Sequence, residues 1–259
     1  MKYVCFSFDD ARSDTFEYAF PILKKYGLKA TVNVISKFII EPESFNFISS
    51  PKPMTKTQLL TWQKEGFEIA CHGATHKNTV DDILQNIKDL KSFDINVDNI
   101  GFASPESWIT KKNLKSTGID ELKQQGLISY IRSGIQIKRE GIFYICLSMF
   151  DQFIHNKYLY YYLNKRNIIT INDIPNILPS AAIKDYTTGN QVQYIINNLK
   201  DDQAIILMFH SVLSPNDKSY GADHYYWSAD RFDSLCKWLV NDKNVMVTTT
   251  YDFYNKFSK

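Results

Sequence analysis

Short apolar runs alternate with longer segments of helical periodicity along the whole chain, and this alternation most constrains the fold. Strand-like runs occur at residues 3–8, 30–35, 67–70, 100–103, 128–131, 204–209 and 245–249. Segments with apolar residues at helical spacing lie at 16–26, 55–65, 79–93, 119–125, 191–199 and 228–241. The pattern is typical of a parallel sheet whose strands are joined by helical crossovers.

The composition fits one globular unit. Hydrophobic residues make up 44% of the 259 residues and charged residues 22%, which excludes a disordered or fibrous chain. With 10 Gly, 8 Pro and no polar linker, a single domain over residues 1–259 is favoured. We expect residues 36–54 to pass over one end of the sheet. Residues 151–190 follow an apolar run at 142–150 and show no clear pattern.

Charge and cysteine content limit the partners and the compartment. The 30 Lys and Arg against 28 Asp and Glu predict neither a nucleic-acid partner nor a membrane-binding patch. The four cysteines are far apart, which favours reduced thiols over a disulfide framework. No apolar run reaches the ~18–20 residues of a transmembrane segment. The chain also lacks a signal-peptide pattern before its acidic residues at positions 9 and 10, so we expect a cytoplasmic protein.

Polar clusters stand directly after several predicted strands. Asp9-Asp10 follows the first strand, His72 and His76 the third, Ser104-Pro105 the fourth, and His210 a late and very apolar strand. The carboxyl ends of parallel strands meet at one edge of the sheet. We therefore expect these side chains to share one site.

Asp10, His72 and His76 are the candidate metal ligands. Two imidazoles four residues apart can bind one cation if the segment forms a helical turn or a compact loop. A carboxylate from another strand end completes a set that leaves coordination positions open. The alternative for the histidines alone is a chance pair in the core or on the surface.

Asp9 and His210 are the candidate acid–base residues. Consecutive strand residues point to opposite faces, so Asp9 and Asp10 can divide their tasks if the backbone turns there. The alternative is a solvated turn. An imidazole with a pKa near ~6.5 suits proton delivery at neutral pH, although a lone histidine beside a core strand is more often structural.

Four short motifs in order give a resemblance to a known family. The motifs are Ser7-Phe8-Asp9-Asp10, His72-Gly-Ala-Thr-His76, Gly101-Phe102-Ala103-Ser104-Pro105 and Leu207-Met208-Phe209-His210. In this order the chain resembles the polysaccharide deacetylases with NodB homology, carbohydrate esterase family 4. The resemblance implies an α/β fold, a distorted (β/α)7 TIM-like barrel, and hydrolysis of N- or O-acetyl groups on sugars.

The resemblance also implies roles for the strand-end residues. Asp9 corresponds to the general base, His210 to the general acid, and Asp10, His72 and His76 to the ligands of one divalent metal ion. Zn²⁺ is our first choice, with Co²⁺, Ni²⁺, Mn²⁺ or Fe²⁺ as alternatives.

The chain departs from the family pattern at two places. The family often has arginine two residues before the proline of its third motif, where this chain has Ala103. Arg132 resembles the arginine that a subset of the family carries one strand later, and we expect it to orient Asp9. A surface salt bridge is the alternative. The glycine usual after Pro105 is replaced by Glu106-Ser107, which predicts an altered rim.

The substrate-binding predictions rest on aromatic residues and the third motif. Trp108, Tyr226 and Trp227 are candidates for stacking on sugar rings, with core packing as the alternative, and Ser104 and Pro105 are candidate substrate contacts. The expected substrate is a small acetylated sugar or glycoconjugate precursor. A non-sugar amide hydrolase and a non-catalytic carbohydrate-binding protein are the competing interpretations. The sequence makes no prediction of oligomeric state.

Overall fold

The computed structural model describes residues 1–45, 52–136 and 140–258. Its strands are β1 (Lys2–Phe8), β2 (Thr31–Val34), β3 (Glu68–Cys71), β4 (Phe102–Ala103), β5 (Ile131–Gly134), β6 (Ile168–Thr170), β7 (Ile177–Ala182), β8 (Gln203–Phe209), β9 (Ser211–Leu213), β10 (Tyr226–Ser228) and β11 (Val245–Thr248). Its α-helices are α1 (Phe20–Tyr26), α2 (Ser36–Ile40), α3 (Lys56–Lys64), α4 (Val80–Ser92), α5 (Ile119–Gln124), α6 (Ile142–Ile154), α7 (Lys157–Asn164), α8 (Gly189–Asn197), α9 (Ala229–Asn241) and α10 (Thr250–Phe257). A π-helical turn, Thr15–Ala19, precedes α1.

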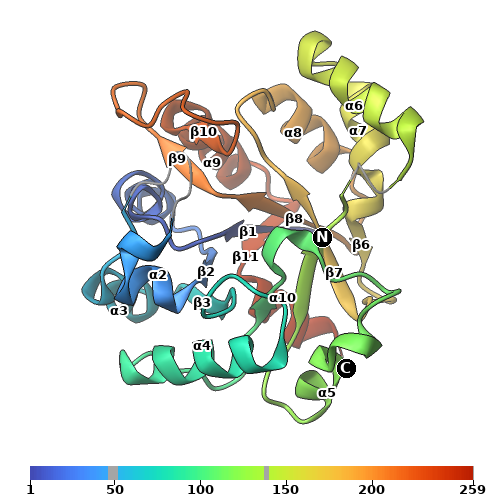
Figure 1. Ribbon diagram of the computed structural model, residues 1–259. Helices are drawn as coiled ribbons and strands as arrows, with labels where there is room; N and C mark the ends of the chain where they lie inside the picture. Colours follow the sequence, from blue (N-terminus) through green and yellow to red (C-terminus); the bar gives the residue numbers. More distant parts are fainter. Residues whose placement is uncertain (46–51, 137–139, 259) are drawn as a thin grey trace.

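Within the described residues, seven parallel strands close into a barrel in the order β1, β2, β3, β4, β5, β7 and β8. The barrel closes because β8 pairs with β1 along its length, from Tyr3↔Ala204 to Phe8↔Phe209. The strands occupy the centre of the molecule and the helices surround them (Figure 1). The predicted α/β fold, a distorted (β/α)7 barrel, is confirmed.

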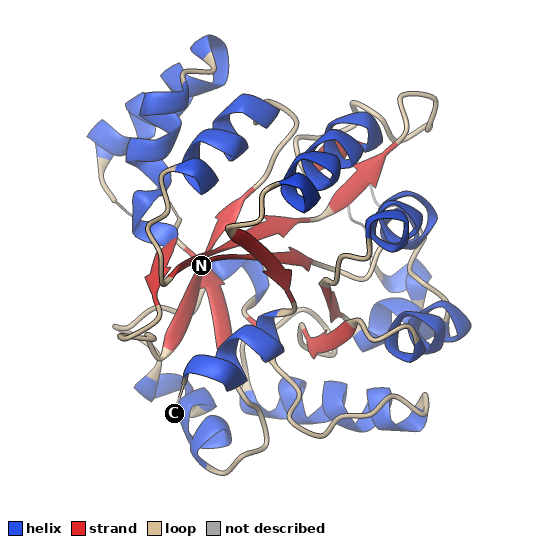
Figure 2. Ribbon diagram, turned by 180° about the vertical axis from the view of Figure 1, so that it is seen from behind, coloured by secondary structure: helices blue, strands red, loops and turns tan. Residues whose placement is uncertain are grey.

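The distortion lies at the amino ends of the strands. There β1 pairs with β11 over Lys2–Cys5 and reaches β2 only at Ser7 and Phe8. In the same way β8 pairs with the antiparallel β6 near Gln203 and with β7 only further along. Figure 2 shows the barrel from behind, with α10 lying close to the strands near the C-terminus. The extra strands leave the pairing between neighbours intact at the carboxyl ends, where the polar clusters emerge.

Alternate residues of β1 face two different environments. Val4, Phe6 and Phe8 pack in the large core beneath the helices, whereas Tyr3 and Cys5 belong to a second apolar cluster that also contains Phe253 of α10. We assign this second cluster to the barrel interior because it joins inner residues of several strands to α10. The period of two that separates these clusters also directs the polar residues at the carboxyl ends into the mouth of the barrel.

Helix starts agree with the sequence. The Thr55 side chain accepts a hydrogen bond from the Gln58 amide, and Gln58 reaches back to the Thr55 amide, which forms a capping box at α3. Thr79 caps α4 and Ser228 caps α9 through side-chain hydrogen bonds of the same kind. Thr55, Thr79 and Ser228 are the first residues of the helical segments predicted from the sequence, so these three helix starts are confirmed.

One predicted strand is displaced. The strand predicted at 128–131 is β5, which begins at Ile131 and continues through Arg132 and Ser133. The predicted strand covered only the apolar run that ends at Ile131, before the polar Arg132 and Ser133. Both side chains are nevertheless buried and bonded: Arg132 Nη2 donates to Asp9, and the Ser133 hydroxyl, on the other face of β5, donates to the Ile109 carbonyl.

Residues 151–190, which showed no clear pattern in the sequence, contain a barrel strand that was not predicted. β7 lies within 151–190, and Pro179 and Ser180 interrupt its apolar pattern. The apolar run at 142–150 belongs to helix α6. Across the described ranges, no helix combines the length and the apolarity needed to cross a membrane.

The half-buried Glu68 lies at the amino end of β3. The Glu68 carboxylate accepts hydrogen bonds from the Thr31 hydroxyl at 2.6 Å, the Tyr130 hydroxyl at 2.6 Å and the Tyr251 amide at 2.9 Å. Burial raises the pKa of Glu68 to about 7, against its ordinary value of 4.5, although the three donors favour the charged form.

Glu68 should make the stability of the protein depend on pH. The folded protein holds this proton up to about pH 7, whereas the unfolded chain releases it near 4.5, so stability falls as pH rises between these values. In Glu68→Gln the decrease in the free energy of unfolding over this pH range should be smaller by on the order of 3 kcal/mol, at ~1.4 kcal/mol per pKa unit. Urea unfolding at pH 5 and pH 8 measures the effect, with the exposed Glu121→Gln as the matched control. An unchanged slope in Glu68→Gln would show that the carboxyl titrates normally.

Candidate metal centre and active site

The backbone turns sharply after β1. Asp10 has φ 73° and Ala11 φ 52°, a left-handed conformation that costs about 1–2 kcal/mol for each such residue. Flanking hydrogen bonds hold the turn: the Asp9 amide donates to the Phe209 carbonyl at 2.8 Å, and the Met54 amide to the Ala11 carbonyl at 2.7 Å. The turn brings both consecutive carboxylates to the mouth of the barrel. The predicted separation of roles, with Asp10 as metal ligand and Asp9 as base, requires this.

His72 and His76 lie on a compact loop, not on a helix. The Asp82 carboxylate closes the loop by accepting from the Thr75 amide at 3.0 Å and the Thr75 hydroxyl at 2.7 Å. Gly73 has φ +76°, and a Cβ there would come within 2.5 Å of an Asp82 carboxylate oxygen. Glycine is therefore required between the two histidines.

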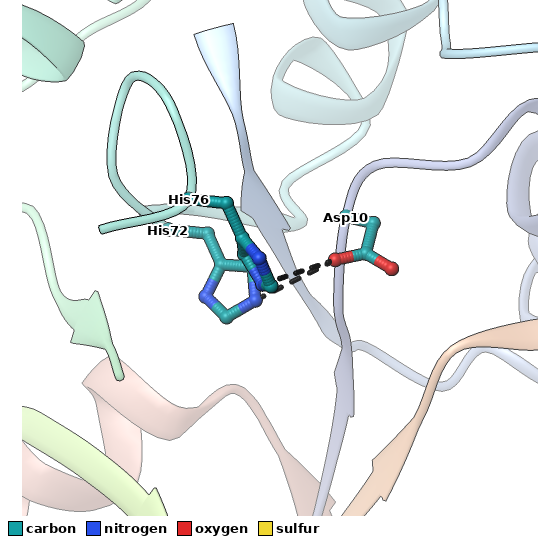
Figure 3. A group of neighbouring side chains, drawn as sticks. All are labelled: Asp10, His72 and His76. Carbon is teal, nitrogen blue, oxygen red and sulfur yellow. Dashed lines mark ion pairs between the residues drawn. The ribbon is translucent and has the colours of Figure 1, made fainter. Parts of the chain in front are cut away.

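The three predicted metal ligands converge. His72 Nε2 lies 3.6 Å and His76 Nε2 3.9 Å from the same oxygen, Asp10 Oδ1 (Figure 3). One ligand atom from each residue lies within 4.8 Å of the others. His72 Nδ1 is 2.8 Å from the Ala103 carbonyl oxygen. That contact requires Nδ1 to carry the proton, so the lone pair of Nε2 faces Asp10.

The charges of these groups suit a cation. Burial, followed by the neighbouring His72, lowers the pKa of His76 to about 4, so its ring is neutral at pH 7. Burial raises the pKa of Asp10, but the Arg12 guanidinium and the neighbouring histidines outweigh it and hold the pKa well below its ordinary value. Two neutral imidazole nitrogens and one ionised carboxylate oxygen form a donor set that divalent transition metals accept.

Arg12 is a site residue that the sequence analysis missed. Its Nε and Nη2 lie 3.0 and 2.8 Å from Asp10 Oδ2, and its Nη1 donates to the Ser211 hydroxyl at 3.1 Å. The guanidinium occupies one carboxylate oxygen and leaves Oδ1 toward the histidines. The sequence signal was an arginine two residues after the aspartate pair. Only the left-handed turn folds it back onto Asp10.

Asp9 is held in a similar way. Its Oδ1 accepts from Arg132 Nη2 at 2.6 Å and from Asn33 Nδ2 at 2.7 Å. Its Oδ2 lies 3.9 Å from His72 Nε2. Burial raises the pKa of Asp9, but Arg132 and the neighbouring histidines outweigh it, so the pKa lies below its ordinary value. Asn33, a polar residue in the middle of β2, was not predicted.

Arg132 reaches Asp9 from the position expected for it. Ala103 of β4 and Arg132 of β5 are register partners, so their side chains stand side by side on the same face of the sheet. The Arg132 guanidinium also donates to the Ser180 hydroxyl of β7 at 3.1 Å. Arg132 is fully buried, so the alternative of a surface salt bridge is wrong.

His210 follows β8 at the same end of the barrel. Its ring centroid is 4.9 Å from that of Tyr225, and its Nδ1 is buried with no hydrogen-bond partner among the described residues. Burial lowers its pKa, and the carboxylates of Asp10 and Asp9 act in the opposite direction. An unpartnered ring nitrogen beside two carboxylates is available to exchange a proton.

The structure contradicts the prediction that Trp227 stacks on a sugar. Its side chain is 0% exposed, packs against Phe209 and donates from Nε1 to the Thr187 carbonyl at 2.7 Å. The alternation along β10 turns Trp227 into the core. Tyr226, the residue before it, is half-buried with its ring 4.7 Å from that of Tyr220.

The side chain of Ser104 is also used inside the protein. Its hydroxyl donates to Asn78 Oδ1 at 2.7 Å and accepts from the Ile109 amide at 3.0 Å. Because Ser104 is buried and already paired, the predicted substrate contact is corrected to a structural role. Pro105 is buried too, whereas Trp108 beyond it is 41% exposed and stays a candidate stacking residue.

The altered rim after Pro105 has an unusual backbone conformation. Glu106 and Ser107, which stand where the resemblance implies glycine, have φ 53° and 49°. The Ser107 hydroxyl accepts from the Gly134 amide at 3.0 Å. The left-handed conformation that favours glycine is thus kept here by larger side chains, one of which ties the rim to β5.

Comparison with known proteins shows what the chain is similar to. Residues 1–105 match the family model described as polysaccharide deacetylase. The resemblance to the polysaccharide deacetylases is confirmed. YxkH of Bacillus subtilis, named as a candidate polysaccharide deacetylase, is 33% identical over 75 residues, which cover 29% of this chain. The match spans about a quarter (24%) of that relative's length.

Solved polysaccharide deacetylase structures share the fold. A family 4 acetyl xylan esterase from Clostridium thermocellum, solved in complex with a cobalt ion, is 14% identical with a TM-score of 0.52; the alignment covers 98% of this chain and 91% of that one. The Bc1960 peptidoglycan N-acetylglucosamine deacetylase is 13% identical with a TM-score of 0.55, over 98% and 88% of the two chains. At these identities the likeness shows the fold alone.

The converging donors predict a single divalent-metal site. After a chelator has removed any bound metal from the protein, we expect titration with Zn²⁺ to give a stoichiometry of about one ion per chain. Loss of a residue that only supports a ligand typically lowers metal affinity by about 10–100-fold. His72→Ala should lower the affinity further, because it removes a ligand itself. His224→Ala is the matched control, since His224 is exposed, pairs with Asp185 and is not one of the three converging donors. Full occupancy in His72→Ala would place the metal elsewhere.

Arg12→Met tests the partner of Asp10 in the same titration. Loss of the guanidinium frees the Asp10 carboxylate to rotate, so affinity should fall by about 10–100-fold. An affinity equal to that of the wild type would mean that Arg12 does not position the ligand.

Proposed function

We propose that this protein is a divalent-metal-dependent hydrolase that removes an N- or O-linked acetyl group from a sugar or glycoconjugate precursor. One observation carries the proposal: a second carboxylate, Asp9, stands beside the Asp10, His72 and His76 donor set with one oxygen left toward it. The match of residues 1–105 to the polysaccharide deacetylase family supports the acetylated-sugar substrate.

Asp10, His72 and His76 would hold the ion. A divalent ion bound there supplies Lewis acidity, which polarises an acetyl carbonyl and lowers the pKa of water. Zn²⁺ is the expected ion because nitrogen and oxygen donors suit it. The cobalt complex of the Clostridium thermocellum esterase supports the view that such folds accept related metals.

Asp9 would act as the general base. Arg132 and Asn33 hold its Oδ1, which fixes the carboxylate plane and leaves Oδ2 to take a proton from the attacking water. The lowered pKa keeps Asp9 ionised at neutral pH. A charge-assisted pair between a guanidinium and a carboxylate is well suited to hold this orientation.

His210 would act as the general acid. Two observations support this role: Nδ1 has no partner among the described residues, and His210 follows β8, across the mouth from the histidines that follow β3. The leaving amine or alkoxide of the sugar would take that proton as the bond to the acetyl carbon breaks. Tyr225, packed on the His210 ring and 44% exposed, would form part of the sugar-binding wall together with Trp108.

We also propose that residues 1–259 act as one deacetylase domain. The barrel needs β5, β7 and β8 to close, and all three lie beyond the residues that match the family. Arg132 lies on β5, Ser180 lies on β7, and His210 directly follows β8. A cytoplasmic location stays a prediction from the sequence.

Acetate release from a substrate panel tests the reaction. We expect the metal-loaded protein to release acetate from short N- or O-acetylated sugars and nucleotide- or lipid-linked precursors faster than from intact chitin or peptidoglycan. Preference for the long polymer would overturn the precursor assignment. Turnover of non-sugar amides alone would overturn the sugar assignment, and no turnover with full metal occupancy would indicate a binding protein.

Asp9→Asn tests the role of the base. Loss of a positioned proton acceptor should lower kcat by about 10²–10⁴-fold while metal binding is retained, because Asp9 is not a ligand. Acetate release and Zn²⁺ titration on the same preparation separate the two effects. The exposed Asp81→Asn of α4 should behave as wild type. Near-normal turnover in Asp9→Asn would refute its role.

A further inference from the structure

Helix α6 presents an apolar face to solvent. The exposed residues of α6 are Ile142, Phe143, Cys146, Met149, Phe150, Phe153 and Ile154. Their spacing of three and four residues places them on one side of the helix. Ile142 is 79% and Phe153 81% exposed, among the most exposed large apolar side chains in the described residues. We call these seven residues the α6 face.

The opposite side of α6 is the polar one, and it faces the protein. Asp151 is buried, and its carboxylate accepts from Gln191 Nε2 of α8 at 3.1 Å. Ser148 and Gln152 are half-buried. A surface helix of a protein surrounded by water normally has the reverse arrangement. A contiguous exposed apolar face of this kind marks an interaction site.

The α6 face lies at the periphery of the molecule. α6 packs on α7, and α7 packs on α8, which covers the barrel. Figure 1 shows α6 and α7 outside α8, away from the centre of the barrel. A flat partner can therefore reach the α6 face without meeting the rest of the fold.

Charge and aromatic content near the α6 face favour an anionic lipid surface. Within residues 141–167 the ionised side chains are the buried Asp151 and three cations, Lys157, Lys165 and Arg166. Arg166 pairs with Glu140, whereas Lys157 and Lys165 are exposed over tyrosine rings. Apolar side chains flanked by lysines and tyrosines are typical of helices that lie in a membrane interface.

A second copy of the chain fits the α6 face less well. A stable protein interface commonly uses about 20–30 residues from each partner. The α6 face offers seven, on a helix of 13 residues that is about 20 Å long at 1.5 Å per residue. The face also contains no charged or hydrogen-bonding pair that would fix a partner helix in register.

We propose that the α6 face docks the protein on anionic lipid bilayers, with Lys157 and Lys165 contacting the headgroups. The apolar side chains enter the boundary between headgroups and acyl chains, and the buried polar side of α6 keeps its contacts with α8. Docking of this kind needs no transmembrane segment and is reversible. It is independent of the reaction proposed above, because no residue of the metal site takes part.

Sedimentation with vesicles tests the proposal. The wild type should bind vesicles of phosphatidylcholine and phosphatidylglycerol, and binding should weaken in high salt and with phosphatidylcholine alone. Phe150→Gln with Phe153→Gln should lower partitioning at least tenfold, since each phenylalanine loses its apolar transfer free energy. Both side chains are exposed, so the fold should persist, and acetate release from a soluble substrate or metal content reports that it does.

Matched variants distinguish the α6 face from general stickiness. Leu84→Gln with Met246→Gln changes two exposed apolar residues on other surfaces and should leave binding unchanged. Lys157→Gln with Lys165→Gln should weaken binding to the anionic vesicles only. Absence of wild-type binding, or equal binding by Phe150→Gln with Phe153→Gln, would overturn the proposal. So would a wild-type dimer that this double variant converts to monomer without any vesicle binding.

Discussion

Two buried arginine–aspartate pairs determine the geometry of the mouth of the barrel. Arg12 takes one oxygen of Asp10, and Arg132 takes one oxygen of Asp9. In each pair the second carboxylate oxygen remains directed toward the histidines that follow β3. Removing one partner of a buried pair leaves an uncompensated charge and commonly costs about 3–5 kcal/mol. Two adjacent carboxylates can therefore stay ionised in one buried site, as the proposed roles of metal ligand and general base require.

The closed barrel is what allows these pairs to form. Arg132 stands on β5 and Asp9 follows β1, which are far apart in the sequence and meet only because β8 returns to β1. Alternation along the strands gives an apolar interior near α10 and a polar interior at the mouth. The strained turn after β1 adds the last element, since it directs Arg12 back onto Asp10.

Sequence reasoning found the parts of the site that are local in the chain. Asp10, His72 and His76 could be predicted because they lie in the segments that follow β1 and β3. The Arg132 contact could be predicted because the motif arginine was absent at Ala103. Asn33 and Arg12 were missed because their partners depend on β-strand register and on a left-handed turn. Trp227 was assigned to the surface because alternation along a three-residue strand cannot be read before its neighbours are known.

The fold was predicted in outline, and the errors fall where local pattern and tertiary environment disagree. β7 carries Pro179 and Ser180, so its strand character comes from pairing with β5 and β8. A net charge of +2 gave no sign of the α6 face, because that face is apolar and only a few cations lie near it.

The central claim is that Asp10, not Asp9, is the carboxylate ligand. Anomalous diffraction from crystals grown with Zn²⁺ or Co²⁺ tests it most directly. The account predicts one peak at about 2.0–2.2 Å from Asp10 Oδ1, His72 Nε2 and His76 Nε2, with Asp9 still bonded to Arg132. A peak coordinated by Asp9 in place of Asp10, or bound away from both histidines, would contradict it.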